Sequence, residues 1–195
     1  GGGLATGIAV NNGEIHMGGN VGSWFYDQNI GRYSTDGTSF STLKPASECL
    51  TSDFNSVSSD GYWMVGEHTK KNQGLYWKFD DIGSDGTRVP GLYGDTKWMS
   101  VSSLGTAVGQ DRHGNGNTKD GAVYCSSLSS KTRQGIPGLA GELTDRGQGR
   151  GISDNGLYCC GYLYSPFTGP GTYMGFRNPN TGIAAAFVLG SGGAS

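Results

Sequence analysis

The chain of 195 residues contains 37 glycines, 15% charged residues and 11% aromatic residues, and its formal net charge is −2. This length is ordinary for one domain with a buried core, and the charge provides no basic surface for nucleic acid. The longest uninterrupted apolar run, 183–189, is too short to cross a bilayer, so no membrane insertion is expected.

The predicted elements begin with two short apolar strands joined by a turn that ends in glycine. This plan occurs four times, in GIAVNNGEIHMGG, NSVSSDGYWMVGE, MSVSSLGTAVGQ and RGISDNGLYCCGY. The turn glycines are Gly13, Gly61, Gly105 and Gly156, and a second set follows at Gly18, Gly66, Gly109 and Gly161. Tight hairpin turns require a residue at positive φ, which glycine adopts without strain. Each segment therefore predicts a β-hairpin.

A third and a fourth strand complete each repeat. The third strands are SWFYDQNIG, GLYWKF, GAVYCSS and TYMGFR, and the fourth strand is clearest in IAAAFVL. Four short strands that recur every 44 to 51 residues are typical of propeller blades. We predict a single all-β domain, a β-propeller with repeats at about 4–50, 51–97, 98–147 and 148–190 and almost no helix. It would be four-bladed or part of a larger ring; a β-sandwich, the alternative, does not predict a fixed repeat.

Two stretches add a resemblance to this pattern. YSTDGTSFSTL followed by SVSSDGYWMVG resembles the Asp-box (BNR-like) repeats of propellers, although Phe40 stands where tryptophan is usual and Gly37 falls one place early. SVSSDGYWMVG and GISDNGLYCCG are similar to the HAF repeats of extracellular bacterial proteins, and such repeats also occur in phage tail and adhesion proteins. The resemblance implies that Asp36 and Asp85 lie at outer corners between third and fourth strands, where a carboxylate accepts backbone N–H groups.

Long polar loops are predicted at one end of the propeller, where strand two meets strand three and each blade meets the next. Loops on a rigid scaffold are common binding surfaces, and aromatic side chains beside polar groups suit sugar rings. The predicted glycan-binding residues are Tyr162, Tyr164, Phe167, Tyr173, Trp98, Tyr93, His113, Asn115 and Asn117. Packing of YLYSPFTGPGTY onto its neighbour and core roles for Trp98 and Tyr93 are the alternatives.

Metal binding has one weak candidate, the loop DRHGNGNTKDG with Asp111, Asn115 and Asp120. It resembles a calcium loop, but Ala122 occupies the position where a bidentate glutamate is expected, so a solvated hairpin loop is favoured. His16, His68 and His113 are predicted to have surface or core roles. We expect no cofactor.

The four cysteines form no C-x-x-C pair, and neighbouring Cys159 and Cys160 would point to opposite faces of a strand, which favours small buried side chains. No paired carboxylates or hydrolase motif indicate catalysis. The predicted function is therefore a non-catalytic recognition or adhesion propeller, an extracellular or phage virion module that binds host-surface glycan. A structural assembly protein that contacts virion or surface proteins, with self-association left open, is the alternative, and a sialidase-like glycosidase ranks third. The Gly- and Ser-rich ends predict flexible connections.

Overall fold

A computed structural model describes residues 2–22, 30–44, 52–68, 73–92, 95–112, 121–136, 146–164, 173–178 and 183–188. In these residues the chain forms four antiparallel sheets of four strands each. The one helical element in the described ranges is a 3₁₀ turn, η1 (Phe79–Asp81). The prediction of an all-β chain built from four four-stranded units is confirmed.

Within each sheet the strands pair in chain order. The first sheet contains β1 (Gly2–Asn11), β2 (Glu14–Gly22), β3 (Ile30–Ser34) and β4 (Ser41–Thr42). The second contains β5 (Asp53–Val57), β6 (Trp63–His68), β7 (Gln73–Lys78) and β8 (Thr87–Arg88). The third contains β9 (Asp95–Val101), β10 (Ala107–Arg112), β11 (Gly121–Ser127) and β12 (Thr132–Gly135). The fourth contains β13 (Arg146–Ile152), β14 (Cys159–Tyr164), β15 (Tyr173–Asn178) and β16 (Ile183–Val188).

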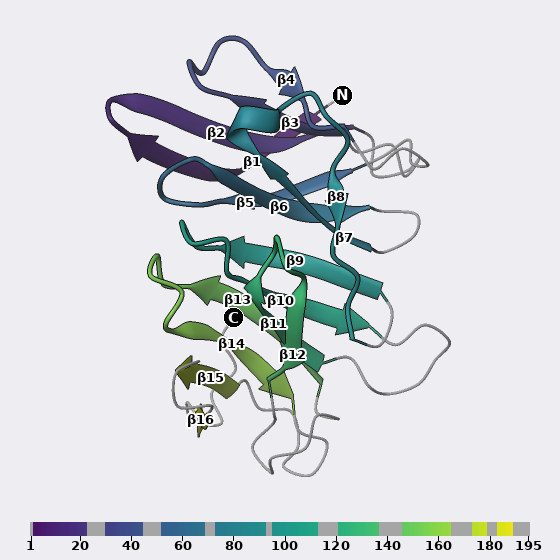
Figure 1. The fold of residues 1–195 in the computed structure, drawn as a ribbon, viewed down its shortest axis with the longest axis vertical. Helices are drawn as coiled ribbons and strands as arrows, with labels where there is room; N and C mark the ends of the chain where they lie inside the picture. Colours follow the sequence, from purple (N-terminus) through teal and green to yellow (C-terminus); the bar gives the residue numbers. More distant parts are fainter. Residues whose placement is uncertain are drawn as a thin grey trace.

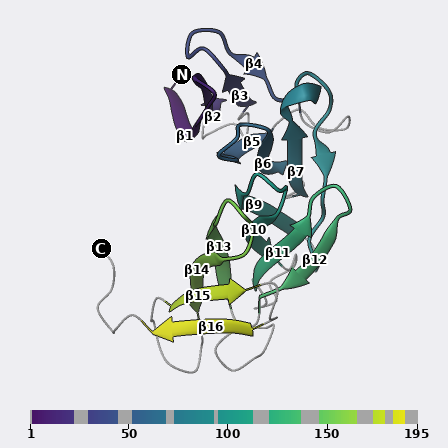
Figure 2. The ribbon, with the colours of Figure 1, turned by 60° about the vertical axis from the view of Figure 1, so that its left-hand side comes forward.

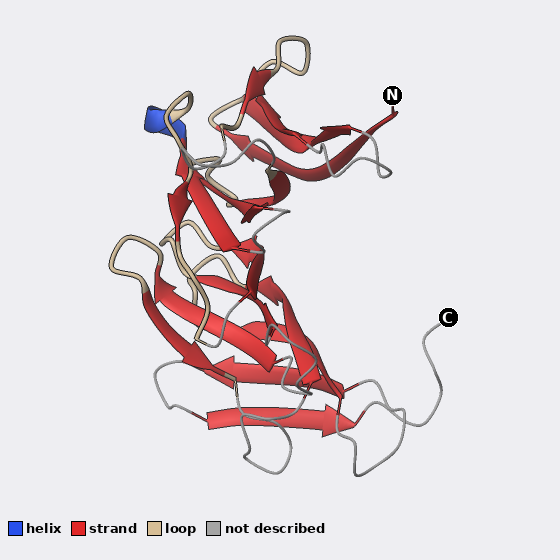
Figure 3. Cartoon of the chain, turned by 90° about the vertical axis from the view of Figure 1, so that its right-hand side faces the viewer, coloured by secondary structure: helices blue, strands red, loops and turns tan. Residues whose placement is uncertain are grey.

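The sheets stack in chain order along an open arc, with the first at the top and the fourth at the bottom of Figure 1. Contacts between sheets join β2 to β5, β6 to β9 and β10 to β13. Figures 2 and 3 show the sheet nearest the N-terminus and the sheet nearest the C-terminus at opposite ends of this arc. The chain thus has the arrangement of four consecutive propeller blades, and residues 95–97, predicted to belong to the second repeat, lie in β9 of the third sheet.

The four hairpin turns each contain a glycine in the left-handed region, with φ of 84° at Gly13, 73° at Gly61, 71° at Gly105 and 68° at Gly156. The predicted reason for these glycines is therefore confirmed. The first hairpin differs in length, because β1 and β2 pair up to Asn11 and Glu14. An Asn-Gly turn with both residues at positive φ closes it, as in two-residue hairpins.

The second set of glycines lies where the first strand of each sheet carries one extra residue, a local shift of register. The glycines opposite the shift are Gly19, Gly66, Gly109 and Gly161. A Cβ on the last three would overlap a carbonyl oxygen of the first strand. In the first sheet the register therefore selects Gly19 rather than the predicted Gly18, whose missing Cβ leaves room for the ring of Phe54.

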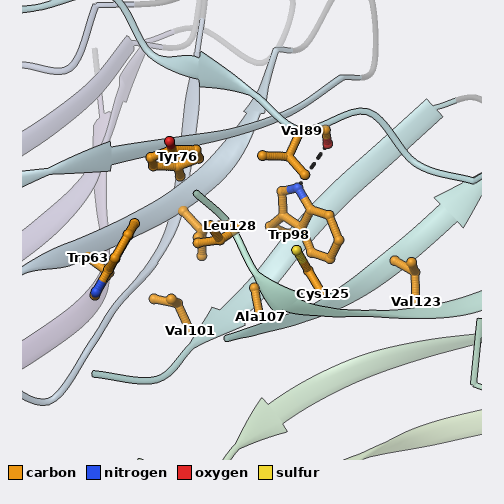
Figure 4. Close-up of a cluster of buried hydrophobic side chains, with 10 residues drawn as sticks. Trp63, Tyr76, Val89, Trp98, Val101, Ala107, Val123, Cys125 and Leu128 are labelled. Atoms are coloured by element: carbon orange, nitrogen blue, oxygen red, sulfur yellow. Dashed lines mark hydrogen bonds between the residues drawn. The ribbon is translucent and has the colours of Figure 1, made fainter. Parts of the chain in front are cut away.

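Apolar side chains on both faces of the inner sheets build the core. In β6, Met64 packs towards the first sheet, whereas Trp63 and Val65 pack towards the third, as strand alternation requires. Figure 4 shows the cluster between the second and third sheets, with Trp98 at its centre. Its buried members are Trp63, Val65, Tyr76, Val89, Trp98, Val101, Ala107, Val123, Cys125 and Leu128. Each interface between sheets is thus a small hydrophobic core.

The corner between β3 and β4 has the predicted turn bonds. Oδ1 of Asp36 accepts backbone N–H groups of Thr38 and Ser39, both at 2.7 Å, and these bonds hold the pKa of Asp36 well below its usual value. The second corner differs: Asp81, not Asp85, accepts the hydroxyl of Ser84 at 2.7 Å. The prediction is confirmed for Asp36, while Asp85 forms no such bond within the described residues.

Two of the described cysteines, Cys125 and Cys160, are free thiols. Cys125 and Cys159 are buried, as predicted, and burial raises the pKa of Cys125 to about 11. Cys160 is half-buried on the opposite face of β14 from Cys159. Cys49 lies outside the described residues.

Candidate functional site

The face of the first sheet that points away from the second sheet is not covered by any other described sheet. Directly paired residues share a face, so Ile8 lies beside Met17, and Val10 lies beside Ile15. Ala9 and His16 form the next pair and are both buried, which places them on the opposite face, against the second sheet. We call the uncovered side the leading face, and its members are Ala5, Ile8, Val10, Ile15, Met17, Val21, Arg32 and Phe40.

The same positions in the following sheets are buried. Ile8 is 67% exposed, whereas Val57 and Val101, which hold the equivalent place in β5 and β9, are 9% and 5% exposed. The equivalence follows from the register, because each of these residues pairs with the residue two places before the glycine at the register shift. The leading face therefore has the chemistry of an interface between sheets, and no sheet among the described residues covers it.

A cavity of about 370 Å³ hollows the leading face. Carbon atoms form almost all of its surface, and the aromatic ring of Phe40 lines it from the corner before β4. Arg32 stands at its edge, where the second and third sheets have the fully buried Leu75 and Val123. Among the described residues Arg32 has no acidic partner, so this face combines an apolar hollow with one available cation.

In the second, third and fourth sheets, the hairpin turn packs directly against a side chain of the preceding sheet. Gly61 lies against the ring of His16, and a Cβ on Gly105 would lie 2.7 Å from the ring of Trp63. A Cβ on Gly156 would likewise lie 2.7 Å from the hydroxyl of Thr106. Gly13, at the tip of the longer first hairpin, has no atom within 4 Å of its Cβ position. Three of the hairpin turns are thus in close contact with the preceding sheet, whereas the Cβ position of Gly13 in the first turn has no neighbour.

The far side of the fourth sheet, which we call the trailing face, has an exposed side chain next to its hairpin turn. Tyr158 is equivalent in register to His16, Trp63 and Thr106. Those three residues contact the hairpin turn of the next sheet. Those three are at most 8% exposed, but Tyr158 is 51% exposed. A second cavity, of about 280 Å³, lies beside Tyr158 and Cys160.

Polar contacts tie the sheets together near the first strands. Asn20 donates to the carbonyl of Phe54 at 2.8 Å and accepts its N–H at 2.6 Å. At the equivalent position of the next sheet, the buried Glu67 forms an ion pair with Lys97. In the third sheet Gln110 accepts a hydrogen bond from Gln148. These contacts hold neighbouring blades in place.

Two predicted site residues have structural roles instead. Trp98 is fully buried and its Nε1 donates to the carbonyl of Val89 at 3.1 Å, which resolves the alternatives in favour of core packing. Asp111 is 1% exposed; it accepts the N–H of Leu92 at 2.5 Å and the hydroxyl of Thr96 at 3.2 Å. Asp111 is thus a buried residue that anchors the connection into the third sheet, and its side chain is not part of a solvated loop.

The structure describes the backbone of three of the nine other predicted site residues. The other six lie outside the described residues: Tyr93, His113, Asn115, Asn117, Asp120 and Phe167. Tyr162 and Tyr164 belong to β14 and Tyr173 to β15, so these three lie on strands rather than in the loop between them. The register pairs Tyr162 with Met174 and Leu163 with Tyr173. A glycan site on this end of the arc stays a prediction.

The described histidines are buried. Nδ1 of His16 forms a hydrogen bond with the hydroxyl of Tyr33, and burial raises the pKa of Tyr33. His68 is 2% exposed at the end of β6. Within the described part of the chain, no group of three or more His, Cys, Asp or Glu side chains is placed to hold a metal ion. No helix of the described residues is long and apolar enough to cross a membrane.

The stacked four-stranded meanders define a protein of the β-propeller type. Solved structures agree: a putative TolB from Agrobacterium tumefaciens matches 93% of this chain at a TM-score of 0.62 and 10% identity, and 60% of its own length is covered. TolB from Acinetobacter baumannii matches 95% of the chain (TM-score 0.54, 12% identity, 43% of its length). Hydrazine synthase from Kuenenia stuttgartiensis also matches 95% (TM-score 0.57, 11% identity, 54% of its length).

These similarities show the fold. The chain spans about half the length of the structures it matches, so each of them extends beyond the four blades seen here. No family model matches the sequence, and no curated protein matches it.

The leading face was not predicted from the sequence. The sequence predicts only a short apolar strand at Ile8 and Val10, and a strand pattern alone does not tell which face meets a neighbour. A signal did exist: both faces of this hairpin carry apolar side chains, as do the hairpins of the inner blades.

Proposed function

We propose that this chain is a non-catalytic recognition propeller that binds protein through the leading face of its first sheet. The observation that supports this is the exposure of Ile8, Val10, Ile15, Val21 and Phe40, which is between 45% and 67% on one face. A contiguous exposed apolar surface with a polar rim is typical of interaction sites. The setting we propose is extracellular or a virion, in keeping with the resemblance of the repeats.

The character of the leading face favours a protein ligand. The cavity of about 370 Å³ accepts one or two apolar side chains, and Arg32 beside it offers a guanidinium to a carboxylate or a backbone carbonyl. Interfaces between proteins bury apolar centres, and arginine and aromatic side chains are frequent among their strongest contacts.

The test is photo-crosslinking in the producing cell or assembled particle. A photoreactive amino acid at position 8 is compared with the same group at position 104, because Ile8 and Leu104 are both 67% exposed. Leu104 lies on the turn of an inner blade, outside the leading face. We expect protein adducts from position 8 that are absent at position 104. Equal labelling at the two positions would contradict the proposal.

Host-surface glycan is the second candidate ligand, supported by the aromatic and polar composition of YLYSPFTGPGTY. A glycan array with the purified protein tests it, together with an assay for release of sugar. Binding without turnover is expected for a recognition module. Tyr164→Ala or Phe167→Ala should then weaken binding by about 1 kcal/mol or more, as loss of a stacking anchor does, whereas release of sugar would indicate a glycosidase.

A further inference from the structure

We propose that the tip of the first hairpin is a site of spontaneous covalent modification, at which Asn12 loses its side-chain amide and becomes an isoaspartyl or aspartyl residue. The inference goes beyond the proposed function, because it concerns the turn between β1 and β2 and needs no ligand on the leading face. Asn12 is followed by Gly13, and both residues are exposed. An asparagine before a glycine meets little steric hindrance in this reaction, since glycine has no Cβ beside the attacking nitrogen.

The reaction joins the backbone nitrogen of Gly13 to the side-chain carbonyl carbon, Cγ, of Asn12. The nitrogen gives its proton to water or hydroxide, the Cγ–N bond of the amide breaks, and the amide nitrogen takes up a proton and leaves as ammonia. A succinimide ring remains, and water then opens it. Attack of water at Cγ gives aspartate, whereas attack at the backbone carbonyl carbon gives isoaspartate. The net change consumes water and releases ammonia, so it needs no oxidant or reductant.

The first hairpin leaves both reacting groups free of hydrogen bonds. β1 and β2 pair as far as Asn11 and Glu14, so Asn12 and Gly13 are the two turn residues, with φ of 50° and 84°. In a hairpin of this kind the flanking residues close the ladder. Among the described residues, neither the side-chain amide of Asn12 nor the N–H of Gly13 has a hydrogen-bond partner. Both groups can therefore move towards each other without losing a bond to the rest of the chain.

The turn of the fourth sheet contains the same pair of residues with both groups bonded. Oδ1 of Asn155 accepts the N–H of Leu157 at 3.0 Å and the hydroxyl of Ser153 at 2.8 Å. The N–H of Gly156 donates to the carbonyl of Ser153 at 2.8 Å. Asn155 is exposed, like Asn12, so access of solvent to the side chain does not distinguish the two sites. Their hydrogen bonds do, because those of the fourth sheet have to break before the nitrogen reaches Cγ.

The products differ from the starting chain in charge and in backbone. Either product places a new carboxylate at the tip, two residues before Glu14. Isoaspartate also lengthens the backbone between Asn11 and Gly13 by a methylene group. Anion exchange therefore separates modified from unmodified chains, and a methyltransferase that esterifies isoaspartyl carboxylates identifies the isoaspartyl product.

The experiment follows the purified chain during storage at mildly alkaline pH, which favours loss of the proton from the attacking nitrogen. Peptide mapping by mass spectrometry measures the converted fraction at each asparagine, and an isoaspartyl methyltransferase with a labelled methyl donor is applied to the same digest. A misplacement of about 1 Å can slow an oriented reaction about a hundredfold, so we expect Asn12 to convert about tenfold faster than Asn155, or more, in the folded chain. In urea the two rates should become similar, since each asparagine then precedes a glycine in an unfolded chain.

Two variants control the assignment. Asn12→Gln should abolish conversion at this position and leave the rate at Asn155 unchanged, because the longer side chain forms the corresponding ring much more slowly. Ser153→Ala should raise the rate at Asn155, because it removes the hydroxyl that donates to this side chain. Circular dichroism verifies that both variants are folded. An unchanged rate at Asn155 in Ser153→Ala would show that the bonds do not protect this site, and the comparison that supports the proposal would fail.

The folded chain itself gives the decisive result. Equal rates at Asn12 and Asn155, or an Asn12 that keeps its amide while Asn155 is converted, would overturn the proposal. A difference that persists unchanged in urea would overturn it as well, because the neighbouring sequence and not the turn would then be its cause.

Discussion

His16 of β2 lies against Gly61, in the hairpin turn of the next sheet, so closely that a Cβ on Gly61 would overlap the imidazole. Gly61 is also at positive φ, so its lack of a side chain serves both the turn and the packing between blades. The hydroxyl of Tyr33 adds a bond of 3.4 Å to the carbonyl of Gly61.

Gly61→Ala should destabilise the protein more than Gly13→Ala. Both changes strain a left-handed residue, at a cost of about 1–2 kcal/mol. Only Gly61→Ala also forces a methyl group into His16, which adds about 1–3 kcal/mol of overpacking. Urea unfolding of the two variants measures the difference. Equal losses would mean that the first two sheets separate easily to relieve the clash.

Asn20→Ala should lower the free energy of unfolding by about 1–3 kcal/mol, because it removes one partner each from the N–H and the carbonyl of Phe54. Ser41→Ala, on the exposed edge strand β4, is the control and should change it by less than about 0.5 kcal/mol. Chemical denaturation reports both. A neutral Asn20→Ala would show that water replaces the side chain at Phe54.

Lys97→Met should destabilise the protein by about 1.5–3 kcal/mol, since it leaves the carboxylate of Glu67 buried without its cation. Adding Glu67→Gln should recover part of this loss, because the amide carries no charge. A double-mutant cycle from urea denaturation gives the coupling energy. The exposed Lys131→Met serves as control, and additive effects of the two core changes would contradict the ion pair.

Because of Asp36, the stability of the folded chain should decrease at acid pH. Its pKa is lowered in the folded chain by the N–H groups of Ser39 and Thr38, so the folded state binds this proton less readily than the unfolded state. The stabilisation is present above the unfolded pKa of about 4 and is lost as the pH falls through the lowered value. Melting temperatures of the wild type and Asp36→Asn should therefore differ most near neutral pH and converge on acidification.

Asp85→Ala is the natural comparison for Asp36→Ala. Asp85 forms no turn bond within the described residues, so its replacement should shift stability by less than about 0.5 kcal/mol. Asp36→Ala should lower the melting temperature at neutral pH. Equal effects would show that both corners depend on their aspartates, as the repeat pattern by itself suggests.

The blades were predictable because their determinants are local. A turn glycine at positive φ, two alternating strands and a third strand close by in sequence define a meander without reference to distant residues. The register was less accessible: Gly18 and Gly19 are adjacent, and only pairing with β1 shows that Gly19 lies opposite the extra residue. The ring of Phe54, from the next sheet, explains Gly18.

The candidate site depended on contacts that no single repeat contains. Trp98 and Asp111 have the composition of a binding surface, yet tertiary packing buries both between blades. The position that Val57 holds in β5 is buried, and the equivalent position in β1, held by Ile8, is exposed, because the first sheet precedes β5 and no sheet among the described residues precedes β1. By itself the sequence determined the strands, the turns and the four-fold repeat. The tertiary structure decided which faces of those repeats meet, since the burial of a side chain depends on the blade that packs against it and not only on its own blade.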